Sequence, residues 1–93
     1  MATPEGKVKA RISRLLSAQS NIYWFMPVQN GMGKATLDYV GWHHGLPFAI
    51  EAKAPGKAPT LRQEHTIGQM VAAGGRVFVI DGDTDELEEW LKT

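Results

Sequence analysis

Cysteine is absent from the 93-residue chain. Disulfide bridges and thiolate zinc sites are therefore excluded, and the three histidines lack the spacing of a zinc motif. We expect two of them, the adjacent His43 and His44, to lie at the tip of a turn. No stretch approaches the roughly 20 apolar residues of a membrane span, and residues 1–5 have no signal-peptide character. These absences predict a soluble, cytoplasmic protein.

An excess of charge of either sign is also missing, because ten lysine and arginine residues balance ten aspartate and glutamate residues. The overall charge therefore gives no general attraction to nucleic acid. The distribution is uneven, with basic residues in the first two thirds and acidic residues crowded near the end. A basic binding face is one interpretation of this pattern, and an ordinary solvated surface is the other.

Residues 1–93 are few enough to form one domain, near the lower limit for a self-sufficient core, so pairing with a second copy would help. Apolar residues at helical spacing predict a first helix over residues 5–18. The aromatic segment 22–28 is typical of a strand, which Pro27 confines to an edge or an end. Residues 29–36 form a glycine-containing connector, which we expect to be a mobile loop beside the site that touches a DNA backbone.

Two strands joined by a tight turn follow, and then a helix that Thr60 and Gln63 open as a capping box and that ends near Ala73. Its expected inward residues are Ile67, Met70, Val71 and Gly74. Residues 76–80 form a continuous apolar strand, and Asp83 with Glu86 caps a last short helix. The element order predicts an α/β fold with a mixed sheet flanked by helices. The third and fourth strands are then parallel neighbours through a right-handed crossover.

The hairpin carries the residues that indicate chemistry. Asp38 precedes Glu51 by thirteen residues, and Lys53 follows Glu51 by two. If His44 and Gly45 form the turn, the numbers of paired residues sum to 89, so Asp38 faces Glu51 with Cβ atoms roughly 5 Å apart. One face then carries Asp38, Val40, Trp42, Ala49, Glu51 and Lys53, and the other, which resembles core, carries Leu37, Tyr39, Phe48, Ile50 and Ala52.

Two facing carboxylates repel, and Lys53 offers a single charge for both. A divalent ion resolves this, because magnesium takes one or two carboxylates, keeps several waters and accepts the backbone carbonyl of Ala52 as a further ligand. Such an ion lowers the pKa of a bound water and stabilises charge on a phosphate under attack. Lys53 would orient that water or help to neutralise the phosphorane. The alternative is a cross-strand salt-bridge cluster on a solvated face.

Two further polar residues have open roles. Glu5 falls on the inward stripe of the first helix, where it either points toward the sheet or simply suits the helix dipole. Gln63 either closes the capping box or supports the site, and the two roles are hard to hold at once.

With Glu5, Asp38, Glu51-x-Lys53 and Gln63 in this element order, the chain resembles the PD-(D/E)xK nuclease superfamily, and more narrowly a stand-alone VRR-NUC domain. The resemblance implies a restriction-endonuclease-like αβββαβα core with Mg²⁺ or Mn²⁺ as cofactor. It also implies that Asp38 and Glu51 are metal ligands, Lys53 the catalytic lysine, Glu5 an additional acid acting on metal or water, and Gln63 a supporting residue. The family often has proline before the first aspartate, whereas this chain has Leu37.

Stand-alone members of this family are similar to Holliday-junction resolvases, which implies a homodimer that cuts four-way junctions. A nuclease acting on flap, nicked or linear duplex DNA is the second hypothesis, and a non-catalytic nucleic-acid-binding domain is the third. The third is disfavoured because clustered acids repel phosphate unless an ion is present. Contacts to DNA phosphates are expected from the basic residues Lys7, Arg11, Arg14, Lys34, Lys57 and Arg62.

Overall fold

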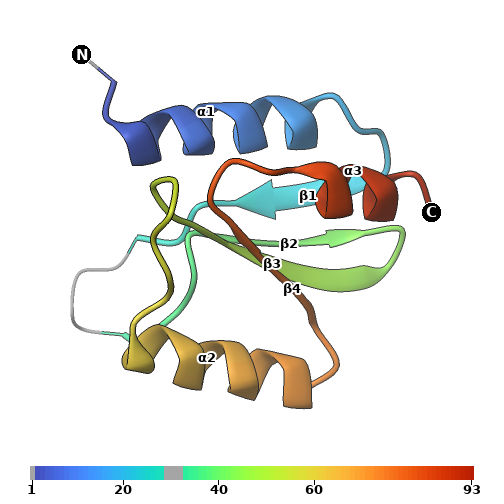
Figure 1. Ribbon diagram of the computed structural model, residues 1–93. Helices are drawn as coiled ribbons and strands as arrows, with labels where there is room; N and C mark the ends of the chain where they lie inside the picture. Colours follow the sequence, from blue (N-terminus) through green and yellow to red (C-terminus); the bar gives the residue numbers. More distant parts are fainter. Residues whose placement is uncertain (1, 29–32) are drawn as a thin grey trace.

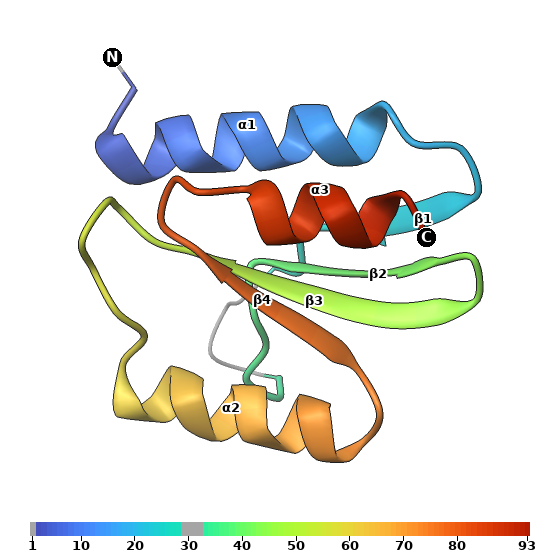
Figure 2. The same ribbon diagram turned by 45° about the vertical axis from the view of Figure 1, so that its right-hand side comes forward.

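The computed structural model describes residues 2–28 and 33–93. The elements follow the order α1 (Pro4–Ser17), β1 (Ile22–Phe25), β2 (Tyr39–His43), β3 (Leu46–Ala52), α2 (Leu61–Ala72), β4 (Arg76–Ile80) and α3 (Asp85–Leu91). The strands form one sheet in the order β1-β2-β3-β4, antiparallel except for the parallel pair β3 and β4. Helices α1 and α3 lie on one face and α2 on the other (Figures 1 and 2). The expected α/β class and the parallel β3–β4 pair are confirmed.

Both long helices begin at side-chain caps, of which only the one at Thr60 and Gln63 was predicted from the sequence. The Thr3 hydroxyl accepts the backbone N–H of Gly6 at 2.9 Å, and Pro4 occupies the first turn of α1, where its missing N–H costs nothing. Thr60 and Gln63 form a complete capping box at the start of α2. At α3, Thr84 takes the N-cap position, and the expected cap Asp83 instead accepts the backbone N–H of Asp85 at 2.9 Å.

The main core lies between the sheet and the α1–α3 layer. Every second residue of each strand points to this face, because successive side chains of a strand point to opposite sides of the sheet. Trp90 of α3 closes the layer, with its ring 5.5 Å from those of both Phe48 and Phe78. The buried residues of this core are Val8, Ile12, Leu16, Tyr39, Phe48, Ile50, Ala52, Phe78, Ile80, Leu87 and Leu91.

Helix α2 covers the opposite face more thinly than expected. Thr66 is its one buried residue among those the structure describes, and Val71, which was expected to point inward, is 54% exposed. Gly74 lies beyond the end of the helix. The contact stripe instead runs through Gln63, Thr66, Ile67 and Met70, because the hydrogen bonds at the N-terminus of α2 fix its rotation and turn Val71 away from the sheet.

Strand β1 ends at Phe25, earlier than the expected strand over 22–28, and Pro27 lies outside it. The strand stands at one edge of the sheet, as Pro27 predicts. It approaches β2 closely where Gly41 pairs with Trp24. A Cβ on Gly41 would lie 2.8 Å from the Trp24 Cα and closer still to the Tyr23 carbonyl oxygen. The close approach of the two backbones therefore depends on glycine at position 41.

The prediction that both adjacent histidines lie at the turn tip is wrong for His43. The turn contains His44 and Gly45, whose φ angles of 49° and 80° fit a two-residue type I′ hairpin. His43 pairs with Leu46 as the last residue of β2. Its side chain alternates onto the core face, where it is 1% exposed and its ring lies 5.3 Å from that of Trp90.

We expect His43 to make the protein less stable in acid. Burial, with a smaller contribution from neighbouring His44, lowers the pKa of His43 below its ordinary 6.5. Between this lowered pKa and 6.5 the unfolded chain therefore binds more protons than the folded chain, and the free energy of unfolding falls by up to about 1.4 kcal/mol per unit as the pH falls through that window. Urea unfolding between pH 5 and 7.5 should show a shallower acid-side slope for His43→Gln than for the exposed control His65→Gln. Equal slopes would contradict this account.

Candidate metal and nuclease site

Asp38 and Glu51 lie at the open end of the β2–β3 hairpin, away from its turn. The observed partners, such as Tyr39 and Ile50, sum to 89, so the predicted register is confirmed. Asp38 itself comes directly before β2, and it reaches β3 through its side chain: Oδ2 accepts the backbone N–H of Ala52 at 2.9 Å. That hydrogen bond fixes the Asp38 carboxylate beside the strand that carries Glu51.

The Glu51 carboxylate is enclosed. Glu51 is 4% exposed, and its Oε2 accepts the Gln63 side-chain amide at 2.7 Å and lies 3.6 Å from Lys53 Nζ. Burial and then the charge of Asp38 raise the pKa of Glu51, and Lys53 opposes that shift in part. The carboxylate repulsion expected from the sequence is therefore present, and a further cation near Glu51 and Asp38 would relieve it.

Gln63 performs both of the roles that were expected to exclude each other. Its Oε1 accepts the backbone N–H of Thr60 at 3.0 Å, which completes the capping box. Its Nε2 donates to Glu51 at the same time. A side-chain amide has separate donor and acceptor ends, so one rotamer satisfies the helix cap and the site together.

Glu5 does not reach the two hairpin carboxylates directly. The ammonium of Lys9 lies 3.3 Å from Glu5 Oε2 and 3.8 Å from Asp38 Oδ1, and so stands between the two acids. Burial lowers the pKa of Lys9, but the charges of Asp38 and Glu5 outweigh it and the net shift is upward. Lys9 was missed as a site residue. The available signal was its i,i+4 spacing from Glu5, which favours an ion pair on the same side of a helix.

The expected donors fit a hard divalent ion, although they form a smaller set than predicted. Within residues 2–28 and 33–93, no three acidic, histidine or cysteine side chains are grouped closely enough to bind an ion together. Asp38 and Glu51 remain as a pair. Because the N–H of Ala52 points at Asp38, the carbonyl of Ala52 points to that same edge of β3. Two carboxylates, one backbone carbonyl and waters form a ligand set that magnesium accepts.

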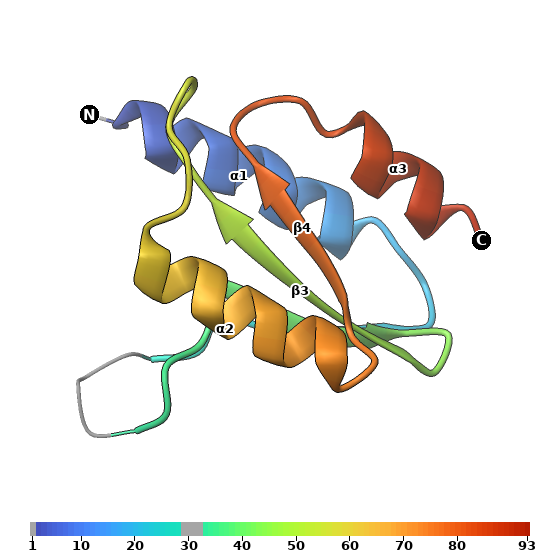
Figure 3. The same ribbon diagram turned by 60° about the horizontal axis from the view of Figure 1, so that its bottom comes forward.

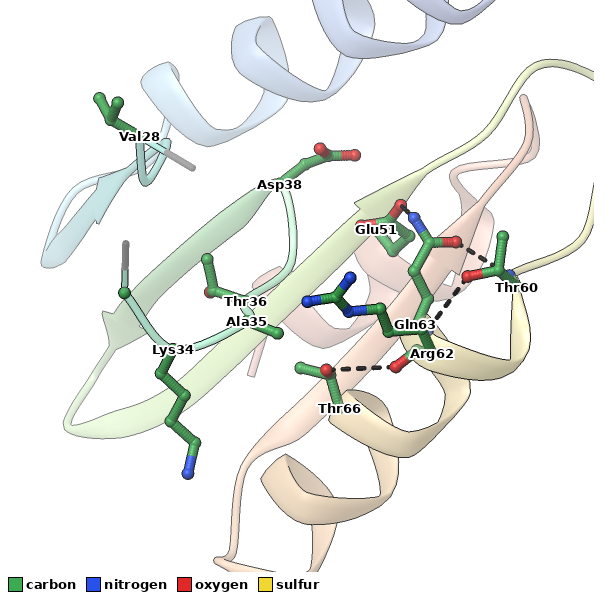
Figure 4. A pocket seen from close by; sticks show the side chains of 11 residues that line it. Val28, Lys34, Ala35, Thr36, Asp38, Glu51, Thr60, Arg62, Gln63 and Thr66 are labelled. Carbon is green, nitrogen blue, oxygen red and sulfur yellow. Dashed lines mark hydrogen bonds between the residues drawn. The ribbon is translucent and has the colours of Figure 1, made fainter. Parts of the chain in front are cut away.

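A cavity of about 360 Å³ opens beside these acids. It lies between the segment around Thr36, the end of β3 and the first turns of α2 (Figure 4). Figure 4 shows the Arg62 side chain extending into this space, whereas the Lys34 side chain, also in the lining, points away from the carboxylates. Strands β3 and β4 end on this side of the molecule, near the starts of α1 and α2 (Figure 3). The cavity is lined by Val28, Gly33, Lys34, Ala35, Thr36, Asp38, Glu51, Thr60, Arg62, Gln63 and Thr66.

The remaining expected DNA contacts are exposed but lie outside this cavity. Lys7, Arg11 and Arg14 are on the exposed surface of α1, where Arg11 Nη1 donates to the Gly82 carbonyl at 3.4 Å. Lys57 lies on the exposed loop between β3 and α2. Residues 29–32 of the connector expected to touch DNA lie outside the described part of the chain.

The described helices all fall short of the length and apolar character that a membrane-spanning helix requires. Comparison with protein-family models, with curated proteins and with solved structures gave no match to this chain. The interpretation of the site therefore depends on the positions of Asp38, Glu51, Lys53 and Gln63.

Proposed function

We propose that this protein is a Mg²⁺- or Mn²⁺-dependent DNA endonuclease with the restriction-endonuclease-like core of the PD-(D/E)xK superfamily, similar to stand-alone VRR-NUC domains. The observation that carries the proposal is that Asp38, held on the Ala52 backbone N–H, and buried Glu51 both line one polar cavity, with the Lys53 ammonium 3.6 Å from the Glu51 carboxylate. A purely structural salt-bridge cluster has no need for a carboxylate that is buried and repelled by its neighbour.

The ion would be held by Asp38, Glu51 and the Ala52 carbonyl, and when bound it would supply a more acidic water and stabilise charge on the phosphate. The other roles belong to the chain itself. Gln63 orients Glu51 through the 2.7 Å hydrogen bond. Lys53 is placed to orient the attacking water or to neutralise charge on the pentacovalent phosphate. Arg62 extends into the cavity, where it would bind the substrate phosphate as a charged fork.

We propose a four-way DNA junction as the substrate and a homodimer as the active form. Two copies of one site are needed to cut two strands symmetrically. The edge strand β1 offers a surface for pairing: Tyr23 is 65% exposed, and its ring lies 6.3 Å from that of Phe25 and 6.1 Å from that of Trp42. Residues 15–33 include no charged side chain, so two copies of this edge would not repel.

The proposal is tested by incubating the protein with labelled four-way junction, flap, nicked and linear DNA in Mg²⁺ or Mn²⁺, and by light scattering at micromolar concentration. Paired symmetric nicks in the four-way junction, together with a dimer mass, are the expected result. Cleavage of flap, nicked or linear DNA instead would change the substrate and keep the chemistry. Binding without cleavage of any of these DNAs would reject the enzyme and leave a nucleic-acid-binding domain.

Divalent ions should stabilise the protein without DNA. At about 100 times the dissociation constant, Mg²⁺ or Mn²⁺ would add about 2.7 kcal/mol to the free energy of unfolding, which is roughly 10–20 °C in Tm for a domain of this size. We expect Asp38→Asn to remove most of this shift and Glu89→Gln, on α3, to retain it. The measurement is a thermal melt at increasing ion concentration with calcium-free buffer. An equal response from Asp38→Asn and wild type would exclude Asp38 as a ligand.

A further inference from the structure

Lys9 is fixed in place next to the proposed ion site by a buried anchor. Tyr39 follows Asp38 in the chain and is fully buried. Its hydroxyl donates to the backbone carbonyl of Lys9 at 2.9 Å and is itself within 2.8 Å of the Ser13 hydroxyl. The turn of α1 that carries Lys9 is thus tied to the start of β2, so the backbone of Lys9 is fixed where its ammonium reaches Asp38.

The two oxygens of Asp38 have different partners. Oδ2 is occupied by the Ala52 N–H, whereas Oδ1 faces the Lys9 ammonium at 3.8 Å. Oδ1, which accepts no backbone N–H of the described residues, is the more available oxygen for an ion bound by Asp38, and it is the oxygen that Lys9 now neutralises. The Lys9 ammonium also lies 3.3 Å from Glu5 Oε2, so an alternative acid is already in contact with it.

We propose that Lys9 is the counter-ion of Asp38 in the ion-free protein. When a divalent ion binds Asp38, the Lys9 ammonium leaves Asp38 and pairs with Glu5 alone. This inference depends on the proposed ion site and deepens it. Lys9 is then a positioning residue that preserves the empty site and weakens divalent binding. Glu5 serves as the acceptor for Lys9, a role different from that of an ion ligand.

The test is calorimetric titration of the protein with Mn²⁺ in the absence of DNA, together with thermal melting of the ion-free protein. Lys9→Gln removes the competing ammonium. Lys7→Gln makes the same change of charge and side chain on α1, two positions earlier and therefore on the other side of the helix. Lys9→Arg keeps the charge and serves as the rescue variant.

We expect Lys9→Gln to bind Mn²⁺ about three- to tenfold more tightly than wild type, because a positive charge a few ångströms from the ion is removed. The same variant should melt at a lower temperature than Lys7→Gln without ions, since Asp38 then lacks its counter-ion. Lys7→Gln and Lys9→Arg should bind Mn²⁺ with nearly the wild-type affinity. If Lys7→Gln tightens Mn²⁺ binding as much as Lys9→Gln does, the gain reflects overall charge and the inference is overturned. Unchanged or weaker Mn²⁺ binding by Lys9→Gln would also overturn it.

A second comparison separates the two roles of Glu5. Glu5→Gln should weaken Mn²⁺ binding in the wild-type background, because Lys9 then remains on Asp38. In the Lys9→Gln background the same change should have a smaller effect. An equal loss in both backgrounds would make Glu5 a ligand and overturn its role as the acceptor for Lys9. Absence of Mn²⁺ binding by the wild type would reject the proposed ion site itself, whereas wild-type binding with no gain in Lys9→Gln would reject this inference alone.

Discussion

Replacing Glu51 by Gln should reduce ion-dependent DNA cleavage at least about 100-fold while leaving the protein folded. The amide removes the negative charge that an ion requires and keeps the shape of the side chain. Its carbonyl oxygen can still accept the Gln63 amide that now donates to Glu51. Single-turnover cleavage of labelled four-way junctions in Mg²⁺ measures the rate. The matched control is Glu64→Gln, because Glu64 is an exposed acid in the first turn of α2, and this variant should cleave at the wild-type rate.

The same variant should be at least as stable as the wild type at pH 7. Because burial and Asp38 raise the pKa of Glu51 above 4.5, the folded chain binds more protons than the unfolded chain between 4.5 and the raised pKa. The contribution of the Glu51 carboxyl to the free energy of unfolding therefore falls as pH rises through that window. Glu51→Gln has no charge to bury, so this decrease is absent from the variant. Urea unfolding at pH 7 checks this sign. Retention of full cleavage, or a large loss of stability at pH 7, would contradict the role given to Glu51.

Replacing Gly41 by Ala should lower the free energy of unfolding by about 3 kcal/mol or more, equivalent to at least roughly 12 °C in Tm. The new Cβ would meet the Tyr23 carbonyl oxygen and the Trp24 Cα, which lies 2.8 Å away. Both are backbone atoms, so no side-chain rotation relieves the clash and β1 must separate from β2. The measurement is urea unfolding of the purified variant, with circular dichroism to detect loss of strand.

Gly68 provides the control for that substitution. It lies within α2, and apart from its chain neighbours and the backbone of its own helix a Cβ there meets nothing in the described part of the chain within 4 Å. Gly68→Ala should therefore raise the free energy of unfolding by about 0.5–1 kcal/mol, because alanine restricts the unfolded chain and favours the helix. A destabilisation by Gly41→Ala no larger than about 1 kcal/mol would show that β1 shifts easily and that its position is not fixed by this contact.

The hairpin was the most predictable part of the molecule. A two-residue turn fixes the register of both strands, so placing His44 and Gly45 at the turn was enough to bring Asp38 to Glu51. The capping box of α2 and the apolar periodicity likewise placed the helices to within a few residues, although the expected Asp83 cap of α3 was not formed. Local rules succeed here because each involves contacts only a few residues apart in the chain.

The errors arose where distant elements meet. His43 became a core residue because α3 places Trp90 against the end of β2. The rotation of α2 depends on the bond between Gln63 and Glu51, so Thr66 replaced Val71 as the inward residue. Lys9 entered the site because the Tyr39 hydroxyl anchors its turn of helix. None of these contacts follows from spacing within one element.

The two hydrogen bonds of Gln63 join a helix end to a buried acid, and this has a consequence for motion. Unwinding the first turn of α2 withdraws the amide donor from Glu51 as well as the cap from Thr60. Local fraying and loss of the arranged carboxylate are therefore a single equilibrium. Any cation that holds Glu51 in its present orientation should therefore slow the exchange of backbone amide hydrogens in the first turn of α2. The exchange rate in that turn then reports whether the ion site is occupied.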